Sequence, residues 1–308
     1  MATVTRPASS GDLIVDRRFE WARESLAAGD AAGAADLVVQ LLDLAPRYAP
    51  AWFLLGEARE QLGDRAGAAE AFARARDADP DDGQGAALRL ARLGAVAAAP
   101  MPAGYVRALF DGYAPQFEKA LVGHLDYRGP AILMQAIQKL HGGGPFHFAR
   151  ALDLGCGTGL AGVAFRPFCD ELTGVDLAPR MLSIAESKGV YARLALGEVM
   201  QFAADEVQAG RRYDLVLAAD VFVYFHDLAA FAGIAPLVTP RGLFAFTVET
   251  HEGDGVMLRD TMRFAHGEAH VRDALQAAGL SLVSLDVASA RTEKGLPAPG
   301  LVVVARRQ

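Results

Sequence analysis

Several features are scarce in this sequence, and each scarcity excludes a class of protein. Only two cysteines occur among the 308 residues, Cys156 and Cys169, too few for a disulfide framework or a zinc site. Lys and Arg number 30 against 37 Asp and Glu, so the net charge of -7 disfavours nucleic acid as a partner. No apolar run is long enough to span a bilayer, and Met1 to Asp12 lacks the pattern of a secretory signal. We therefore expect a cytoplasmic protein without a nucleic-acid or membrane partner.

The sequence does contain an internal repeat. Its period is 34 residues, because Ala34 aligns with Ala68 and Pro46 with Pro80. The length and the globular composition, 52% hydrophobic and 22% charged, allow a second domain after the repeat.

The second copy of this repeat resembles the tetratricopeptide repeat, in its residues Trp52, Leu55, Gly56, Ala68, Phe72, Ala75 and Pro80. Gly56 and Ala68 let two helices approach closely, Phe72 fills the groove between them, and Pro80 ends the second helix. We interpret residues 1–98 as a small all-α repeat domain, with a lone third helix at 84–93 and a linker at 97–104. Such a domain either binds a protein or peptide partner or serves packing and self-association.

From Arg150 onward, short apolar strands alternate with helices, which indicates a parallel sheet. The expected strands are 151–154, 171–176, 191–196, 213–219, 242–249, 280–287 and 300–305. The first strand runs directly into Gly155-Cys156-Gly157-Thr158-Gly159. Glycines are needed there because the backbone turns sharply and approaches a ligand without Cβ atoms in the way.

The glycine loop alone is compatible with more than one cofactor. Residues 157–162 satisfy the dinucleotide fingerprint G-x-G-x-x-G, which keeps an NAD-dependent oxidoreductase open. Asp153 argues against it, because a carboxylate inside the preceding strand would repel a pyrophosphate and attract a cationic sulfonium with an α-amino group. Asp176 ends the second strand and is suited to bind both hydroxyls of a ribose.

Residues 152–159, followed by Gly174-Val175-Asp176-Leu177-Ala178, resemble class I S-adenosylmethionine methyltransferases, over about residues 105–308. The resemblance implies a Rossmann-like, doubly wound, mostly parallel seven-stranded sheet with an antiparallel C-terminal hairpin. It also implies S-adenosylmethionine as cofactor and S-adenosylhomocysteine as product. Together with the repeats, the chain resembles a group of predicted bacterial methyltransferases. The domain would span residues 99–308, with a helical lid at 105–145 and a core at 150–308.

The same resemblance assigns the cofactor contacts. The glycine loop would hold the methionine and ribose portions, Asp176 the ribose, and Leu177 the adenine. Met181 would form a second adenine wall, or belongs to the helix core, and Glu198 would read the adenine amino group. The cofactor-binding candidates are Asp153, Gly155, Cys156, Gly157, Gly159, Asp176, Leu177, Met181, Glu198, Asp220 and Val221.

Candidates for the acceptor side come from the lid and from the loops after the fourth and fifth strands. The catalytic candidates are Tyr113, His226 and His251, and the substrate-binding candidates are Arg128, Tyr224 and His266. Tyr113 would close on the methionine end, and Arg128 would hold an anionic group or form a surface salt bridge. Each histidine also has a structural interpretation. His266 and His270 are four residues apart but lack a third ligand, so we expect no metal.

The predicted function is methylation of a small, acidic or hydroxylated acceptor, on oxygen and by in-line displacement. The Asn-Pro-Pro-aromatic loop that marks many amide and nucleobase N-methyltransferases is missing; Asp220-Val221-Phe222-Val223 stands in its place. Two alternatives remain open. One is a protein methyltransferase whose repeats recruit the target; the other is a repeat-based interaction protein with a vestigial methyltransferase fold.

Overall fold

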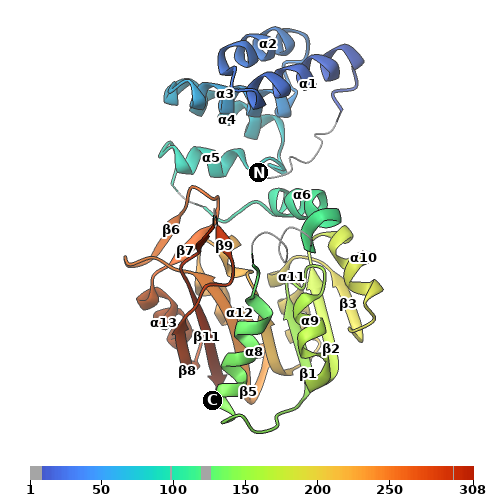
Figure 1. Ribbon diagram of the computed structural model, residues 1–308, viewed down its shortest axis with the longest axis vertical. Helices are drawn as coiled ribbons and strands as arrows, with labels where there is room; N and C mark the ends of the chain where they lie inside the picture. Colours follow the sequence, from blue (N-terminus) through green and yellow to red (C-terminus); the bar gives the residue numbers. More distant parts are fainter. Residues whose placement is uncertain (1–8, 98, 119–125, 294) are drawn as a thin grey trace. The chain divides into compact units, whose positions relative to one another are not determined.

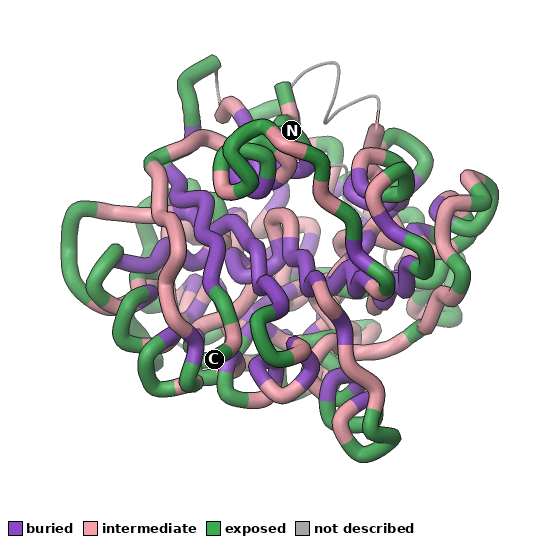
Figure 2. The backbone as a smooth tube through the Cα atoms, turned by 90° about the horizontal axis from the view of Figure 1, so that it is seen from below, coloured by how far each residue is buried: buried purple, intermediate pink, exposed green. Residues whose placement is uncertain are grey.

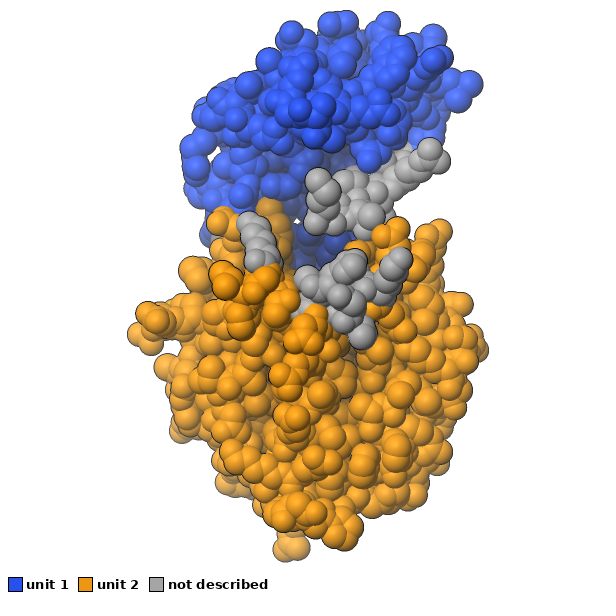
Figure 3. Space-filling view, viewed as in Figure 1, with its two compact units in different colours: residues 1–109 blue, residues 110–308 orange. Residues whose placement is uncertain are grey.

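The computed structural model describes residues 9–97, 99–118, 126–293 and 295–308. The chain divides into two compact units, Met1–Leu109 and Phe110–Gln308, coloured separately in Figure 3. Residues 1–8 of the predicted repeat domain, position 98 of the predicted linker and residues 119–125 of the predicted lid lie outside the described residues.

The first unit is entirely helical among its described residues (Figure 1). Its helices are α1 (Leu13–Ala27), α2 (Ala31–Leu44), α3 (Ala49–Gln61), α4 (Arg65–Ala78), α5 (Ala86–Arg92) and the first part of α6 (Ala103–Tyr113). Three of them begin at aspartates whose carboxylates accept backbone N–H groups, namely Asp12, Asp30 and Asp64. Such caps satisfy donors that the first helical turn leaves unpaired.

The predicted close approach of α3 and α4 is present. A Cβ on Gly56 would lie 2.5 Å from Cε1 of Phe72, so only glycine fits there. Phe72 and Ala68 are fully buried. Helix α4 ends at Ala78, two positions before Pro80, as a proline stop requires.

The second unit is built on one twisted sheet with the strand order β3-β2-β1-β4-β5-β11-β8 (Figure 1). Its strands are β1 (Phe148–Leu154), β2 (Cys169–Asp176), β3 (Arg193–Leu196), β4 (Tyr213–Ala218), β5 (Val238–Glu249), β8 (Leu280–Val287) and β11 (Gly300–Arg307). Strands β1 to β5 pair in parallel, whereas β11 pairs antiparallel with both β5 and β8. The predicted fold class and C-terminal hairpin are therefore confirmed.

Two short strands extend this sheet beyond the seven that were expected. Strand β6 (Val256–Leu258) pairs with β7 (Phe264–His266), and β7 pairs with β5 through Glu249 and Ala265. With only three residues each, they carry no readable alternation. A separate pair, β9 (Thr292–Glu293) and β10 (Leu296–Pro297), lies in the connection between β8 and β11.

Helices cover both faces of the sheet, and the buried strands run through the middle of the unit (Figure 2). One core joins the sheet to α11 (Val199–Gln208), α12 (Phe231–Ile234) and α13 (Glu268–Ala277). The other joins it to α8 (Gly129–Leu140) and α9 (Leu160–Phe165). Helix α10 (Pro179–Ser187) follows β2. Because β1, β2, β3 and β4 are parallel, their carboxyl ends meet at one edge, where ligands bind in such folds.

Within the described ranges, no helix combines the length and apolarity needed to cross a bilayer.

Candidate functional site

The predicted glycine loop follows β1 at the carboxyl edge of the sheet. Gly155, Gly157 and Gly159 have φ values of +62°, +53° and +87°, which L side chains rarely adopt. A Cβ on Gly155 would also lie 2.6 Å from Cγ2 of Val221, the third residue after the end of β4 at Ala218. A Cβ on Gly157, by contrast, would have only one atom of the described residues within 4 Å, a ring carbon of Phe117 at 3.9 Å. The loop is therefore tightly packed against the segment after β4 and least crowded above Gly157, where, in the part of the chain described, only Phe117 comes within van der Waals distance.

Asp176, at the end of β2, is fastened to this loop. Its Oδ2 accepts the N–H of Gly157 at 2.8 Å, and its Oδ1 accepts the N–H of Ala178 at 2.8 Å. Burial raises the pKa of Asp176 above its ordinary value, and the charge of Asp111 adds to this, while the backbone hydrogen bonds oppose it. The carboxylate thus stands between the glycine loop and the start of α10, the place predicted for a ribose contact.

Asp153 lies below the loop, with 1% of its surface exposed. It accepts a 2.6 Å hydrogen bond from the hydroxyl of Tyr191. Burial, reinforced by the charge of Asp176, raises the pKa of Asp153 to about 7, although the bond from Tyr191 acts in the opposite direction. The sequence pattern predicts Tyr191 as the first residue of the third strand and so gives no sign of this contact. In the structure, β3 begins at Arg193, and Tyr191 lies in the segment before it.

Cys156 is buried in the same loop, and burial raises the pKa of its thiol well above the ordinary value. A protonated, buried thiol is a poor nucleophile, so Cys156 stays a predicted cofactor contact within the loop and is no nucleophile candidate.

The predicted adenine side lies at the start of α10. Met181 is fully buried beside Ala178 and Ala114, with Phe110, Phe117 and Ile184 packed against them. Leu177 is half-buried. Glu198 accepts the N–H of Gln201 at 2.8 Å and so caps α11. Its predicted contact with the adenine amino group would compete with this capping bond.

An aromatic wall joins the lid to the loop after β4. It consists of Phe110, Tyr113, Phe117 and Tyr224, in successive edge-to-face contacts. Ring centroids are 5.7 Å apart for Tyr113 and Phe117, 6.0 Å for Phe110 and Phe117, and 5.4 Å for Phe110 and Tyr224. The wall therefore runs from Gly157 to the loop after β4 and brings together two predicted site residues, Tyr113 and Tyr224.

Asp220 follows β4 with a φ of +61°, which is strained for a residue with a side chain. Its N–H donates to Oγ1 of Thr247 at 2.8 Å, and its Oδ2 accepts a 3.1 Å bond from Nη1 of Arg263. Strained non-glycine residues of this kind cluster at functional sites. The contacts hold the Asp220 carboxylate at the ligand edge, next to Val221 and the glycine loop.

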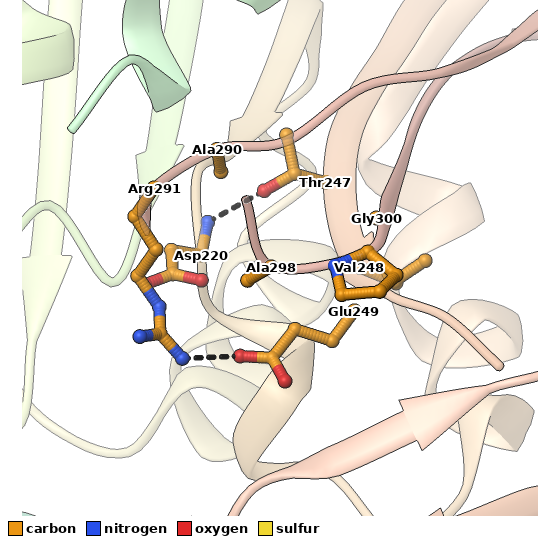
Figure 4. A pocket seen from close by; sticks show the side chains of 9 residues that line it. Asp220, Thr247, Val248, Glu249, Ala290, Arg291, Ala298 and Gly300 are labelled. Atoms are coloured by element: carbon orange, nitrogen blue, oxygen red, sulfur yellow. Dashed lines mark hydrogen bonds and ion pairs between the residues drawn. The ribbon is translucent and has the colours of Figure 1, made fainter. Parts of the chain in front are cut away.

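An ion-pair cluster surrounds Asp220, and sequence reasoning missed most of it. The carboxylate of Glu249, at the end of β5, contacts Arg291 at 2.5 Å and both Arg259 and Arg263 at 3.4 Å (Figure 4 shows Arg291 and Glu249). Burial alone would lower the pKa of Arg263, but Tyr224, Asp220 and Glu249 raise it above its ordinary value.

Tyr127 is a further residue that the predictions left out. Its hydroxyl lies 3.5 Å from the carbonyl oxygen of Ala219. Burial and then the charges of Asp220 and Asp153 raise its pKa well above the ordinary value, so the phenol stays protonated near both acids. Its neighbour Arg128 has an exposed side chain, and the Arg128 backbone N–H donates to Ala290 at 2.7 Å.

The predicted histidines lie around this edge in different environments. His226 is half-buried, with its ring 5.5 Å from that of Phe264. His251 accepts the N–H of Gly253 at 3.0 Å within its own loop. His266 is fully buried, contacts the carbonyl of Phe222 at 3.1 Å and stacks on His270. Burial lowers the pKa of His266 to about 4, so it is neutral near pH 7. Within the described ranges, no three His, Cys, Asp or Glu side chains are grouped to hold a metal.

Comparisons with known proteins agree with this geometry. Residues 152–244 match the family model of a methyltransferase domain, and residues 25–93 match that of a tetratricopeptide repeat. The prediction of a methyltransferase domain preceded by tetratricopeptide repeats is thereby confirmed.

Individual relatives match shorter stretches. Methyltransferase-like protein 27 of Homo sapiens is 39% identical over 88 residues, which are 28% of this chain and 35% of that protein. A ubiquinone biosynthesis O-methyltransferase of Cereibacter sphaeroides is 32% identical over 120 residues, 39% of this chain and 49% of that protein. The chain thus spans less than half the length of these curated relatives.

Among solved structures, the fold is similar to that of 1,6-didemethyltoxoflavin-N1-methyltransferase from Burkholderia thailandensis, crystallised with 1,6-didemethyltoxoflavin and S-adenosylhomocysteine. The TM-score is 0.51 and the identity 23%, over 69% of this chain and 93% of that one. At this identity the likeness establishes the fold.

Proposed function

We propose that this chain, which carries a methyltransferase domain at residues 152–244, binds S-adenosylmethionine and methylates an oxygen of a small, acidic or hydroxylated acceptor. The observation that carries the proposal is the hydrogen bond from the N–H of Gly157 to Asp176, in a glycine loop that is least crowded above Gly157. A carboxylate there accepts the two hydroxyls of a ribose, and the less crowded face of the loop admits the rest of the nucleoside.

The residues present fit this cofactor. Asp176 would hold the ribose, with Leu177 and Met181 against the adenine and Asp153 below the methionine end. When bound, S-adenosylmethionine supplies a methyl group activated by its positive sulfonium. Two acids, the buried Asp153 and the half-buried Asp176, suit a cation far better than a pyrophosphate, which disfavours NAD.

The chain's own residues would orient the acceptor and remove its proton. Methyl transfer is an in-line displacement, so alignment of the two reactants supplies most of the rate. The aromatic wall, defined by Phe110, Tyr113, Phe117 and Tyr224, would exclude water and align the acceptor. A hydroxyl acceptor needs a base, for which Asp220, His226 and His251 are the candidates. Similarity to an O-methyltransferase supports oxygen as the acceptor atom.

The repeats favour one competing function, which we keep as a second candidate. A tetratricopeptide-repeat match over residues 25–93 supports binding of a protein or peptide partner, and thereby methylation of a recruited protein. Incubating a lysate with radiolabelled cofactor separates the two: label in the small-molecule fraction supports the first function, and label in the protein fraction supports the second. The cytoplasm stays the predicted compartment.

Calorimetric titration with S-adenosylmethionine, S-adenosylhomocysteine and NAD tests the cofactor. We expect micromolar binding of the first two and no heat with NAD. Binding of NAD alone would contradict the proposal, and silence from all three would leave the repeat-based interaction protein as the better description.

A further inference from the structure

Arg263 has one edge of its guanidinium fixed and the other open. Its Nη1 makes both of its acid contacts, to Asp220 at 3.1 Å and to Glu249 at 3.4 Å. Its Cζ lies over the ring of Tyr224, 5.4 Å from the ring centroid, which is the distance of a cation–π contact. No hydrogen bond recorded within the described residues uses its Nε or Nη2, and the side chain keeps 19% exposure. The open edge is therefore available to a ligand.

The ion pairs around Arg263 leave guanidinium donors unused. Arg259, Arg263 and Arg291 converge on the carboxylate of Glu249, with Asp220 beside Arg263 as a second acid and Glu293, 3.7 Å from Arg291, as a third. Arg291 is 5% exposed, and its buried Nε has no hydrogen-bond partner in the part of the chain described. In Figure 4, Arg291 and Asp220 line one small pocket together with Glu249. A buried guanidinium with an unused N–H donor is stabilised by a further acceptor oxygen, which a carboxylate supplies.

This open edge lies on the acceptor side of the proposed methyl transfer. Asp220, which holds Arg263, directly precedes Val221, the residue in contact with Gly155. The aromatic wall then leads from Tyr224, beneath Arg263, through Phe110 and Phe117 to Gly157, where Phe117 lies 3.9 Å from a Cβ placed on the glycine. An acceptor with an anionic end and a flat apolar body would place its anionic end at Arg263 and its apolar body along the aromatic wall.

We propose that the open edge of Arg263 binds a carboxylate of the acceptor, and that the acceptor's aromatic body lies against Tyr224 and Phe110. The proposal rests on the methyltransferase function and names its substrate class, an aromatic carboxylic acid. A planar guanidinium pairs with a carboxylate through two parallel N–H···O bonds, which a neutral amide cannot replace. Arg263 then sets specificity, while Asp220 and Glu249 fix its orientation.

The test uses benzoate and benzamide, which have the same shape and differ in charge. Each is titrated calorimetrically into the full-length protein, with and without S-adenosylhomocysteine. We expect the protein saturated with S-adenosylhomocysteine to bind benzoate roughly tenfold more tightly than benzamide. Arg263→Gln should abolish that preference and leave the affinity for S-adenosylhomocysteine unchanged. Arg263→Lys keeps the positive charge but lacks the planar guanidinium, so it should retain only part of the preference for benzoate. This variant replaces Arg263→Gln in the test if Arg263→Gln fails to fold.

Arg211→Gln is the matched control. Arg211 also pairs with a buried carboxylate, that of Glu206, but at the opposite edge of the sheet. This variant should keep the preference for benzoate. Equal affinities of the wild-type protein for benzoate and benzamide, no binding of either, or a preference that survives in Arg263→Gln would each overturn the proposal. Absence of S-adenosylhomocysteine binding would instead contradict the methyltransferase function. The benzoate and benzamide titrations carried out without S-adenosylhomocysteine test Arg263 independently of that function.

Discussion

The hydroxyl of Tyr191 donates a 2.6 Å hydrogen bond to Oδ2 of Asp153, beneath the glycine loop. The Tyr191 ring fits against three glycines, since a Cβ on Gly159, Gly162 or Gly174 would lie 3.0, 2.3 or 2.9 Å from it. One side chain thereby connects β1, the start of α9 and β2. Its position makes the acid and the loop parts of a single packed unit.

Tyr191→Phe should weaken cofactor binding without unfolding the protein. The ring stays in its place, but the buried carboxylate of Asp153 loses its donor, and its pKa rises further. Loss of a hydrogen bond to a charged group costs about 1.5–3 kcal/mol, so we expect at least about a tenfold loss of S-adenosylhomocysteine affinity by calorimetry. Tyr213→Phe is the control, because Tyr213 also donates to a buried carboxylate, that of Glu206, away from the site. Equal losses in both variants would contradict a special role for Tyr191.

Gly162→Ala should displace Tyr191. The new Cβ would lie 2.3 Å from the Tyr191 hydroxyl oxygen and 2.4 Å from its Cζ, so the ring has to shift. Overpacking of this kind costs about 1–3 kcal/mol, visible as a lower midpoint of thermal unfolding and weaker cofactor binding. Gly197→Ala is the matched substitution, since no atom lies within 4 Å of its Cβ position. If the Gly162→Ala protein were as stable as the Gly197→Ala protein, the glycine loop would accommodate the new Cβ and the prediction would be wrong.

Stability should depend on pH through Asp153. Its folded pKa of about 7 lies above the ordinary carboxyl value, so the folded state favours the protonated form. The stability contributed by that proton is complete below about pH 4 and is lost as the pH rises through about 7. Asp153→Asn mimics the protonated form and still accepts from Tyr191. Between about pH 5 and about pH 8.5, the unfolding midpoint of the wild type should therefore fall relative to that of the variant. A constant difference across this range would rule out the raised pKa.

Asp176→Ala should weaken binding of S-adenosylmethionine by about 3 kcal/mol, or roughly a hundredfold, since a two-point ribose contact and the anchor of Gly157 are lost together. Asp214→Ala provides the comparison, because Asp214 likewise accepts a backbone N–H, from Arg150, but at the amino end of β4. It should reduce stability and leave the affinity for the cofactor intact. An unchanged affinity in Asp176→Ala would remove Asp176 from the ribose site.

The glycine loop and Asp176 could be placed at the sheet edge from the sequence because their signals are local. A buried strand, a glycine loop and an acid at the end of the next strand follow one another within residues 151–176. The strands from β1 to β5 were also found, because their apolar runs are bounded by turns. The ion-pair cluster was missed: Arg263 and Arg291 were not singled out, Glu249 was seen only as the end of a strand, and the two three-residue strands that flank Arg263 were not predicted.

The sequence by itself determined the fold class, the repeat and the position of the glycine loop, since each depends on residue patterns within one or two elements. Only the tertiary structure decided which distant side chains meet. Tyr191 reaches Asp153 across 38 positions, Arg291 reaches Glu249 across 42 and Arg263 reaches Asp220 across 43. The physical reason is that burial and charge pairing depend on the packed sheet edge, where several loops converge, and a pattern along the chain does not record which loops those are.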